Sequence, residues 1–448
     1  MSTLRLFATL ALGGALTVGC AAAEDDFTTA ELGTTQAPLL QNENPIEGEY
    51  IIRLKDGVDH AGLMAAANRV ALAGDNSEVR HTYGVISGFS AKLSPGMLKQ
   101  LRADPSVDFI EQNGLVHADT VHNVGTGLEG LDRVDQRQLP LSGTYDDGGN
   151  TGLGVNVYIV DTGINQGHNE FTGRVAQAAD FVGDGQNGED CNGHGSHVAS
   201  TALGTNFGLA KQATLHGVRV LNCQGSGTFA DVIAGIDFVA ADCPNQGGPC
   251  VANMSLGGGF SQSLNDAVAA AVSSGVPFAV AAGNESTSAC NRSPASEPSA
   301  FTVAASDDND NHISFSNFGS CVDIYANGVG VLGANAGGAN ATQTISGTSM
   351  ASPHVAGAVA QFLGANPNAS VAQVEDAMKT AATPDCVANA PSGTANLLLF
   401  DDFSQPGAGL GCDGGGGGEC APAGASCDSN SDCCSNKCRG RSGNQTCR

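Results

Sequence analysis

A nearly continuous apolar run, Val155-Asn-Val-Tyr-Ile-Val160, leads directly into Asp161-Thr-Gly163. Such a run predicts a strand that is buried on both faces, as in a parallel sheet covered by helices. Further buried strands are expected over residues 214–221, 251–254, 277–281 and 300–304, with helices between them, for example over 231–241 and 263–274. This alternation predicts an α/β domain with a doubly wound, mostly parallel sheet. Asp161 is a candidate site residue because open α/β sheets bind ligands at the carboxyl ends of their strands, although an Asp before Gly is also common in turns.

Two smaller regions flank this domain. Strand and helix patterns alternate twice over residues 47–121, which predicts a small ferredoxin-like α+β domain. A Gly-rich linker over 405–418 leads to a cysteine-dense tail over 419–448. We therefore expect a signal peptide at 1–23, a spacer at 24–46, the small domain at 47–121 and the α/β domain at 122–404, followed by the linker and the tail.

The charge of the chain is strongly negative, with 45 acidic and 19 basic residues among 448 and a formal net charge of -26. This balance argues against nucleic acid or an anionic membrane surface as the main partner. After the N-terminal segment, no apolar run is long enough to span a membrane. Charged residues make up only 14% and hydrophobic residues 41%, so most of the chain is expected to fold.

The N-terminal segment and the cysteines predict export. Arg5 precedes an apolar stretch from Leu6 to Gly19, which is typical of a bacterial signal peptide. Cleavage among the alanines at 21–23 and lipidation of Cys20 both stay open, because the residues before Cys20 form a loose lipoprotein box. The chain has 15 cysteines, and those after Cys20 fall into even groups, which indicates disulfides and an extracellular, oxidising compartment.

Two more motifs carry candidate chemistry. In Asn192-Gly-His-Gly-Ser-His-Val-Ala199, glycines flank His194, so that its ring can be approached closely. His197 is expected to be a buried structural residue, since no zinc-ligand spacing accompanies the two histidines. In Gly347-Thr-Ser-Met-Ala-Ser-Pro-His354, Ser349 opens a helix, where backbone N–H groups stabilise negative charge. An ordinary helix N-cap is the alternative interpretation of this serine.

Together with Met254-Ser-Leu-Gly-Gly258 and Ala281-Ala-Gly-Asn284, these motifs closely resemble those of the subtilisin-like serine proteases, in particular the proteinase K and aqualysin branch. The resemblance extends over about residues 50–400. It implies a catalytic triad in which Ser349 is the nucleophile, His194 transfers its proton and Asp161 orients the histidine. It also implies an oxyanion hole made by the Asn284 side chain and the Ser349 backbone N–H.

The resemblance further implies how propeptide and substrate bind. Residues 47–121 resemble the inhibitory propeptide of these proteases, which the enzyme would cut off between Val116 and His122; a folding helper without lasting inhibition is the alternative. Two extended segments would hold the substrate strand, and small residues would form a roomy, uncharged pocket with a broad apolar preference. The residues concerned are Gly225, Ser226, Gly227, Ser255, Leu256 and Gly257 in the segments and Ala281, Ala282 and Gly283 in the pocket; plain turn chemistry is the alternative for the glycines.

Structural calcium is implied at two places, and no organic cofactor is expected. One site would use the carbonyl oxygens of Pro298 and Ala300 with the Asp323 carboxylate, because calcium prefers oxygen ligands. A second would use Asp132, Asp135, Gln136 and Ser142, for which surface ion pairing is an equal alternative. The acidic loop over 184–190 is a weaker candidate for a third site than for solvated charge.

Disulfides are expected throughout the exported part. The resemblance implies Cys191–Cys223 and Cys290–Cys321, while Cys243 and Cys250 close a short loop and Cys386 and Cys412 remain for each other. The tail resembles the inhibitor cystine-knot miniproteins, or knottins. That resemblance implies the pairs Cys420–Cys434, Cys427–Cys438 and Cys433–Cys447.

Two classes of function are compatible with these features. The first is a secreted, monomeric serine endopeptidase, made as a self-processing zymogen, whose partners are polypeptide substrates and its own propeptide. The second is a non-enzymatic surface or binding protein that presents the knottin-like tail. Because all four residues of the implied triad and oxyanion hole are present, the sequence favours the enzyme.

Overall fold

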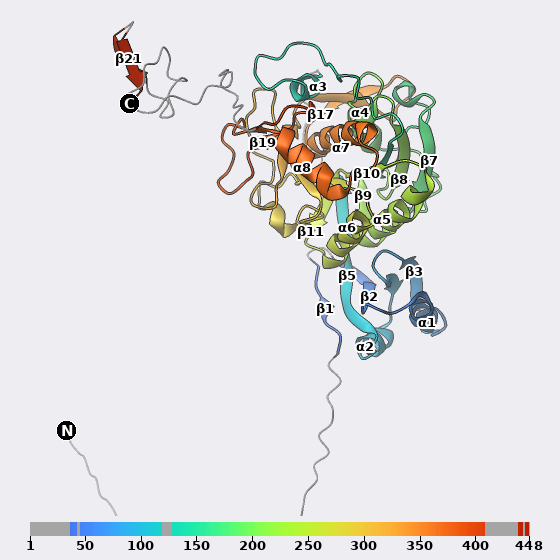
Figure 1. The fold of residues 1–448 in the computed structure, drawn as a ribbon. Coiled ribbons are helices and arrows are strands. Elements are labelled where there is room, and N and C mark those ends of the chain that lie inside the picture. Colours follow the sequence, from blue (N-terminus) through green and yellow to red (C-terminus); the bar gives the residue numbers. More distant parts are fainter. Residues whose placement is uncertain (1–35, 43–44, 119–127, 408–437, 442–443, 448) are drawn as a thin grey trace, which may run out of the picture. The chain divides into compact units, whose positions relative to one another are not determined.

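The computed structural model describes residues 36–42, 45–118, 128–407, 438–441 and 444–447. The predicted signal peptide, Cys20, Cys412 and most of the predicted tail lie outside these described residues. Within them, no helix has both the length and the apolar character that crossing a membrane requires. Figure 1 shows the order of the elements along the chain.

The small N-terminal domain is an antiparallel sheet in the strand order β5-β2-β4-β3, connected through two helices in the ferredoxin-like pattern. The elements are β2 (Pro45–Leu54), α1 (His60–Ala71), β3 (Glu78–Tyr83), β4 (Gly88–Lys92), α2 (Pro95–Arg102) and β5 (Val107–Ala118). Ile52, Phe89 and Ile110 are fully buried between this sheet and the helices. The expected ferredoxin-like topology is thus present in the structure.

Two details of this domain differ from the sequence expectations. Strand β3 was not predicted, because its alternating exposed residues give little hydrophobic signal. The expected spacer over 24–46 was too long at its C-terminal end, since Leu39–Leu40 forms strand β1, which pairs in parallel with β5, and β2 begins at Pro45. Such a short segment can join a sheet through backbone hydrogen bonds alone, so its sequence need not show a strand pattern.

The large domain is built on a sheet in the order β18-β19-β15-β14-β12-β10-β6-β8-β7, parallel except for the pairing of β18 with β19. The predicted strands over 155–160, 214–221, 251–254, 277–281 and 300–304 all occur, within a few residues at their ends. Its strands are β6 (Asn156–Asp161), β7 (Val175–Asp180), β8 (Thr214–Arg219), β10 (Cys250–Met254), β12 (Phe278–Ala281), β14 (Phe301–Ser306), β15 (Ile324–Asn327), β18 (Thr383–Pro384) and β19 (Leu397–Leu398).

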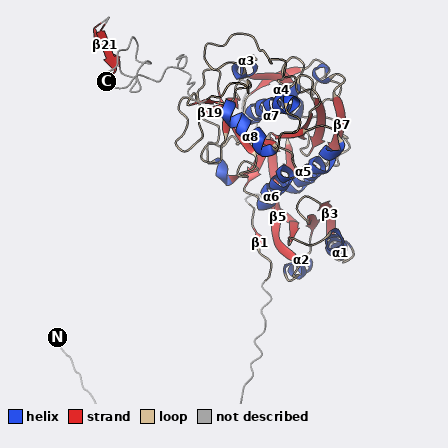
Figure 2. Ribbon diagram, viewed as in Figure 1, coloured by secondary structure: helices blue, strands red, loops and turns tan. Residues whose placement is uncertain are grey.

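Helices cover both faces of this sheet (Figure 2). Val157 and Ile159 of β6 belong to the core that contains α4 and α7, whereas Tyr158 and Val160 belong to the core that contains α5 and α6. Each such buried side chain contributes about 1.5–3 kcal/mol relative to an exposed one. The helices are α3 (Glu129–Val134), α4 (His194–Leu203), α5 (Phe229–Asp242), α6 (Gln262–Ser273), α7 (Thr348–Ala365) and α8 (Val371–Ala381), with short 3-10 turns η1 (Asn169–Phe171), η2 (Cys243–Asn245) and η3 (Ala289–Asn291).

The strand order places a topological switch point at β6. From β6 the chain builds β7 and β8 on one side of this strand, and then crosses over to build β10, β12 and β14 on the other. Asp161 is the last residue of β6, so it lies at the switch point, where such sheets bind ligands. The shorter strands outside this sheet are β9 (Ser226–Thr228), β11 (Leu256–Gly259), β13 (Arg292–Ser293), β16 (Val331–Ala334), β17 (Thr342–Ile345), β20 (Cys438–Arg441) and β21 (Asn444–Cys447).

Three predicted disulfides are confirmed: Cys191–Cys223, Cys243–Cys250 and Cys290–Cys321. Cys386 is also disulfide-bonded, and Cys412, its predicted partner, lies outside the described residues. In the tail, Cys438 and Cys447 are backbone register partners in the β20–β21 hairpin. The other four cysteines of the predicted knot lie outside the described residues, so the knottin-like module remains a prediction.

Candidate active site

The structure brings Asp161 and His194 into contact. Asp161 is the last residue of β6, and His194 is the first residue of α4, where its Nδ1 lies 2.8 Å from Asp161 Oδ1. The two elements approach closely because Gly195 has no side chain; a Cβ there would overlap the carbonyl oxygen of Gly163. Both the carboxylate and the imidazole are buried, which strengthens an electrostatic interaction between them.

Ser349 lies at the start of the second central helix, α7, which packs against α4. Its hydroxyl donates to the Ser255 carbonyl at 3.1 Å, and the Ser255 hydroxyl donates to the Ser349 carbonyl at 2.8 Å. This pair of hydrogen bonds joins the helix N-terminus to the segment that was expected to hold the substrate. Backbone N–H groups at a helix N-terminus in general favour negative charge.

Asn284 is joined to the same helix through Thr348. The Asn284 Oδ1 atom accepts from the Thr348 backbone N–H at 2.9 Å and from the Thr348 hydroxyl at 3.1 Å. These bonds orient the amide, so that its NH2 group points away from Thr348. The Thr348 hydroxyl also accepts from the Gly283 N–H at 3.1 Å. Sequence reasoning missed this role of Thr348, whose only sign was its place directly before Ser349 in the same motif.

The two predicted substrate-binding segments both pair with the N-terminal domain. Strand β5 runs antiparallel to β9, with Leu115 opposite Thr228 and His117 opposite Ser226. It also runs antiparallel to β11, with Ala118 opposite Leu256. The end of this domain therefore occupies the space between the two segments, as a bound substrate strand would.

Polar contacts add to this ladder at the starts of two helices. The carboxylate of Glu111 accepts from the backbone N–H of Ser263 at 2.8 Å, in the first turn of α6. The Asn113 side chain accepts from the backbone N–H of Ala230 at 3.1 Å, in the first turn of α5. Burial raises the pKa of Glu111, although its hydrogen bonds to Ser263 and Ser261 act in the opposite direction. A carboxylate at a helix N-terminus contributes about 0.3–2 kcal/mol.

Ala281 and Ala282, which were expected to line the specificity pocket, are buried at the end of β12, directly before Gly283. Gly283 has a φ of +97°, and a side chain there would overlap the Asn317 amide. The Asn317 amide donates to the Ala282 carbonyl at 2.8 Å and to the Glu285 carboxylate at 2.5 Å. Asn317 thus supports this segment, a contact that sequence reasoning did not find.

The expectation of solvated charge holds for only part of the acidic loop before His194, since residues 184–187 are exposed whereas Asp190 is buried. Asp190 is buried and accepts hydrogen bonds from Gly193 N, Ser196 N and the Thr162 hydroxyl at 2.8, 2.9 and 3.0 Å. The Asp184 carboxylate instead contacts Arg219. Among the described residues, no group of three or more His, Cys, Asp or Glu side chains could hold a metal ion.

His197 has the structural role that its sequence context predicted. It is fully buried, and its Nε2 donates to the Val331 carbonyl at 2.9 Å. Burial lowers the pKa of His197 to about 3, so the ring stays neutral in the folded protein. His354 is similar: burial lowers its pKa to about 4, and Nδ1 donates to the Met350 carbonyl at 2.8 Å.

The two implied calcium sites differ in how well their residues fit a cation. At the first, the Lys379 ammonium lies 3.0 Å from Asp323 Oδ1, and Asp323 Oδ2 accepts from the Thr302 N–H at 2.9 Å. The Lys379 side chain therefore already neutralises the Asp323 carboxylate, and these residues fit a calcium ion poorly. Lys379 belongs to α8, which the calcium expectation did not consider.

At the second site the residues do converge on one loop. Ser142 N–H donates to the Gln136 side-chain oxygen at 2.8 Å, and the Ser142 hydroxyl donates to Asp132 Oδ1 at 2.8 Å. Burial raises the pKa of Asp135, and repulsion from Asp132 and Asp146 adds to the effect. The side-chain oxygens gathered at this loop are of the kind that calcium prefers.

Comparisons with known proteins identify the family of each domain. Residues 152–405 match the model of the subtilase family (Peptidase_S8), and residues 49–119 match that of peptidase inhibitor I9. The chain is 44% identical to the "Extracellular serine proteinase" of Thermus sp. (strain Rt41A) over 391 residues, which cover 83% of this chain and 94% of the relative. It is 48% identical to "Alkaline serine exoprotease A" of Vibrio alginolyticus over 319 residues, 70% of this chain and 58% of the relative.

A solved structure is also similar. The crystal structure of a cold adapted subtilisin-like serine proteinase aligns with a TM-score of 0.59 and 47% sequence identity, over 62% of this chain and 99% of that one. The family match spans more than half of the chain, and it contains Asp161, His194, Asn284 and Ser349. The chain therefore belongs to the subtilase family, and it is a subtilisin-like serine endopeptidase with an inhibitor I9 propeptide.

Proposed function

We propose that the chain is a secreted zymogen whose mature form hydrolyses peptide bonds with Asp161, His194 and Ser349, and with Asn284 in the oxyanion hole. One observation carries the proposal. Strand β5 leads the propeptide between β9 and β11 as far as Ala118, opposite Leu256, and the adjacent residue Ser255 accepts the hydrogen bond from the Ser349 hydroxyl. The propeptide thus reaches the proposed nucleophile along the path that a substrate would follow.

The reaction follows from the roles of these groups. Ser349 Oγ attacks the scissile carbonyl carbon, and His194 Nε2 takes the hydroxyl proton. Asp161 accepts from His194 Nδ1–H, which holds the tautomer and stabilises the imidazolium. The Asn284 amide and the Ser349 N–H donate to the oxyanion, His194 passes its proton to the leaving amine, and water then hydrolyses the acyl-enzyme.

Substrate binding would repeat the propeptide ladder. Gly225–Gly227 and Ser255–Gly257 would pair with the substrate backbone, which gives affinity with little side-chain selectivity. Ala281, Ala282 and Gly283 would line a pocket for the residue before the cut, with a broad apolar preference. We propose that the enzyme cuts its own chain between Val116 and His122, a range that begins inside β5.

Several finer features belong to the same proposal. Secretion is supported by a relative that is named extracellular, and anchoring through Cys20 is the alternative to release. Asp132, Asp135, Gln136 and Ser142 would hold a structural calcium ion, which would supply only charge neutralisation to this loop. The mature enzyme would be a monomer that carries the knottin-like tail.

The test compares wild type with Ser349→Ala after secretion from a bacterial host. Intact mass and casein hydrolysis are measured on both proteins. We expect wild type to lose about 120 N-terminal residues, as the position of the propeptide predicts, and to digest casein, whereas the variant keeps its propeptide and remains inactive. If wild type and variant remain equally inert and unprocessed, the tail-presenting binding protein becomes the better interpretation.

A further inference from the structure

A fully buried arginine lies beside the proposed catalytic aspartate. Arg219 ends strand β8, and its side chain has no exposed surface. In the sheet, its register partner on one side is Asp161 of β6 and on the other side Asp180 of β7. A guanidinium keeps its charge at every pH at which a protein is folded, so this position holds a permanent cation next to the triad.

The N–H groups of the guanidinium donate hydrogen bonds to acceptors on three different segments of the chain. Its Nε donates to the Thr162 carbonyl at 3.1 Å, directly after Asp161 in the chain. Its Nη1 contacts Asp180 Oδ2 at 3.0 Å, while Nη1 and Nη2 form a bidentate pair with Asp184 at 2.7 and 2.8 Å. A planar fork of this kind fixes direction as well as distance, which a lysine cannot reproduce.

Thr162 connects this anchor to both halves of the Asp–His pair. Its N–H donates to Asp161 Oδ1 at 2.7 Å, and its hydroxyl accepts from the N–H of Gly195 at 2.8 Å. Gly195 directly follows His194 in α4. Arg219 binds the Thr162 carbonyl, and Thr162 in turn contacts both Asp161 and Gly195. Arg219 therefore fixes the residue that connects the aspartate to the first turn of α4.

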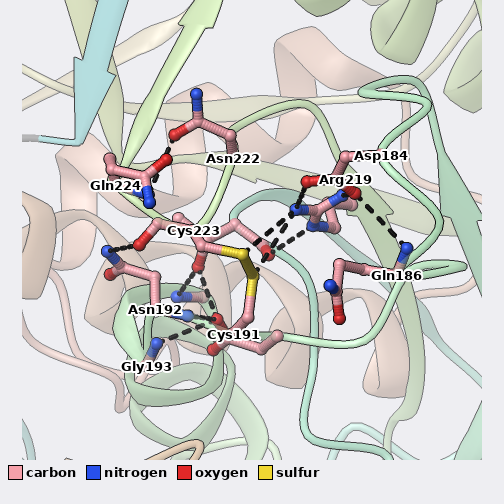
Figure 3. The surroundings of a disulfide bond; sticks show 12 residues. Asp184, Gln186, Cys191, Asn192, Gly193, Arg219, Asn222, Cys223 and Gln224 are labelled. Atoms are coloured by element: carbon pink, nitrogen blue, oxygen red, sulfur yellow. Dashed lines mark hydrogen bonds and ion pairs between the residues drawn. A yellow bond between two sulfur atoms is a disulfide. The ribbon is translucent and has the colours of Figure 1, made fainter.

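The same guanidinium lies against the Cys191–Cys223 disulfide (Figure 3). Its Nη2 is 3.5 Å from the Cys191 sulfur and 3.9 Å from the Cys223 sulfur. Cys191 lies three residues before His194, and Cys223 lies three residues before Ser226, where β9 begins. The Asn192 side chain adds a bond of 3.1 Å to the Cys223 carbonyl.

We propose that Arg219 is a positioning residue for catalysis, which sets the spacing of Asp161, His194 and the substrate strand β9 without touching the substrate. The proposal rests on the proposed triad. Two effects follow if Arg219→Lys keeps the charge but loses the fork. The Asp161–His194 contact loosens, which lowers kcat and moves the acid limb of the kcat/KM profile to lower pH, because the imidazolium is less well stabilised. The freed β9 raises KM for substrates long enough to pair with it.

The experiment compares matured wild type, Arg219→Lys, Asp184→Asn and the control Arg174→Lys. Arg174 is partly buried and donates to backbone carbonyls, among them that of Leu203 at the C-terminal end of α4, far along the helix from His194. Its other side-chain bond is to the Thr205 hydroxyl, and none of these bonds reaches Asp161, Thr162 or the first turn of α4. A fluorophosphonate that reacts with active serines gives the concentration of working sites, and kinetics are normalised to it. Substrates are a tetrapeptide anilide and a single-residue ester.

We expect Arg219→Lys to lower kcat/KM per active site at least tenfold for the tetrapeptide and less for the ester, with the acid limb lower by several tenths of a pH unit. Asp184→Asn changes the exposed end of the network, so it should lower kcat/KM and the pH of the acid limb by smaller amounts. This variant replaces Arg219→Lys in the test if Arg219→Lys does not mature. Arg174→Lys should stay within twofold of wild type.

Three outcomes would overturn the proposal. Kinetics and acid limbs of Arg219→Lys and Asp184→Asn that match wild type would show that the network is only structural, as would an equal loss in Arg174→Lys. A wild-type protein that does not react with the fluorophosphonate would instead overturn the proposed function, and the role of Arg219 with it.

Discussion

Replacing Asp401 by asparagine should make the protein more stable at neutral pH and change little at acidic pH. The Asp401 side chain is buried, and its Oδ2 accepts from the Tyr145 hydroxyl at 2.8 Å. Gln361 donates to that hydroxyl in turn, at 2.7 Å. Burial raises the pKa of Asp401 to about 7, and the charge of Asp135 adds to the effect.

The sign and size of the effect follow from this pKa. Between about pH 4 and pH 7 the unfolded chain loses the Asp401 proton while the folded protein keeps it, so the free energy of unfolding falls as the pH rises. The interval from 3.8 to about 7 is roughly three pKa units, which at about 1.36 kcal/mol each gives about 4 kcal/mol. That is a substantial part of the 5–15 kcal/mol by which a typical domain is stable.

The assay is thermal unfolding in the Ser349→Ala background, which prevents autolysis, with a chelator present because Asp135 is a proposed calcium ligand. The unfolding midpoint of Asp401→Asn is compared with that of its parent at pH 4 and pH 8. The amide keeps an acceptor for Tyr145 but has no proton to lose, so the variant should gain stability over its parent only at the higher pH.

Asp402→Asn is the matched control. Hydrogen bonds from Ser404 lower the pKa of the Asp402 carboxyl, so its removal should cost stability at pH 8 and not add to it. The reasoning is refuted if Asp401→Asn shows the same difference between the two pH values as its parent.

Two further predictions concern the oxyanion donor and the first calcium site. Asn284→Ala should lower kcat by a factor of about 100–1,000 with little change in KM, because the amide acts only on the developing oxyanion; steady-state kinetics on protein matured in trans by wild type measure this, and a loss confined to KM would contradict the role. Lys379→Met should make the unfolding midpoint respond more strongly to calcium than in the parent, since Asp323 then lacks its cation. Equal responses to calcium and chelator in both proteins would show that Lys379 does not take the place of the ion.

Much of the architecture follows from local patterns in the chain. Strand β6 is recognisable because its residues are buried on both sides and therefore apolar almost without interruption. His194 and Ser349 are recognisable because close packing demands glycine and small residues around them, and such short segments are distinctive. The pairing of Cys243 with Cys250 is equally local, since the two lie seven residues apart.

Other residues carry no local sign of their role. Asp184 and Asp190 stand in one acidic loop, yet Asp190 caps the His194 turn while Asp184 pairs with Arg219, 35 residues away. Asp323 matched a calcium motif, but only folding shows that Lys379, from a later helix, reaches its carboxylate. The local amino-acid sequence does not distinguish an aspartate that is solvated in the folded protein from one that is buried.

The sequence by itself determined the order of the domains, the doubly wound sheet and the residues that match the triad, because burial and tight turns restrict which amino acids can stand at those positions. Only the tertiary structure decided which partner each ionisable side chain meets, and that strand β5 pairs with both β9 and β11. The physical reason is distance along the chain: the energy of a charge or of a ladder hydrogen bond depends on groups that become neighbours only when strands and helices far apart in sequence pack together.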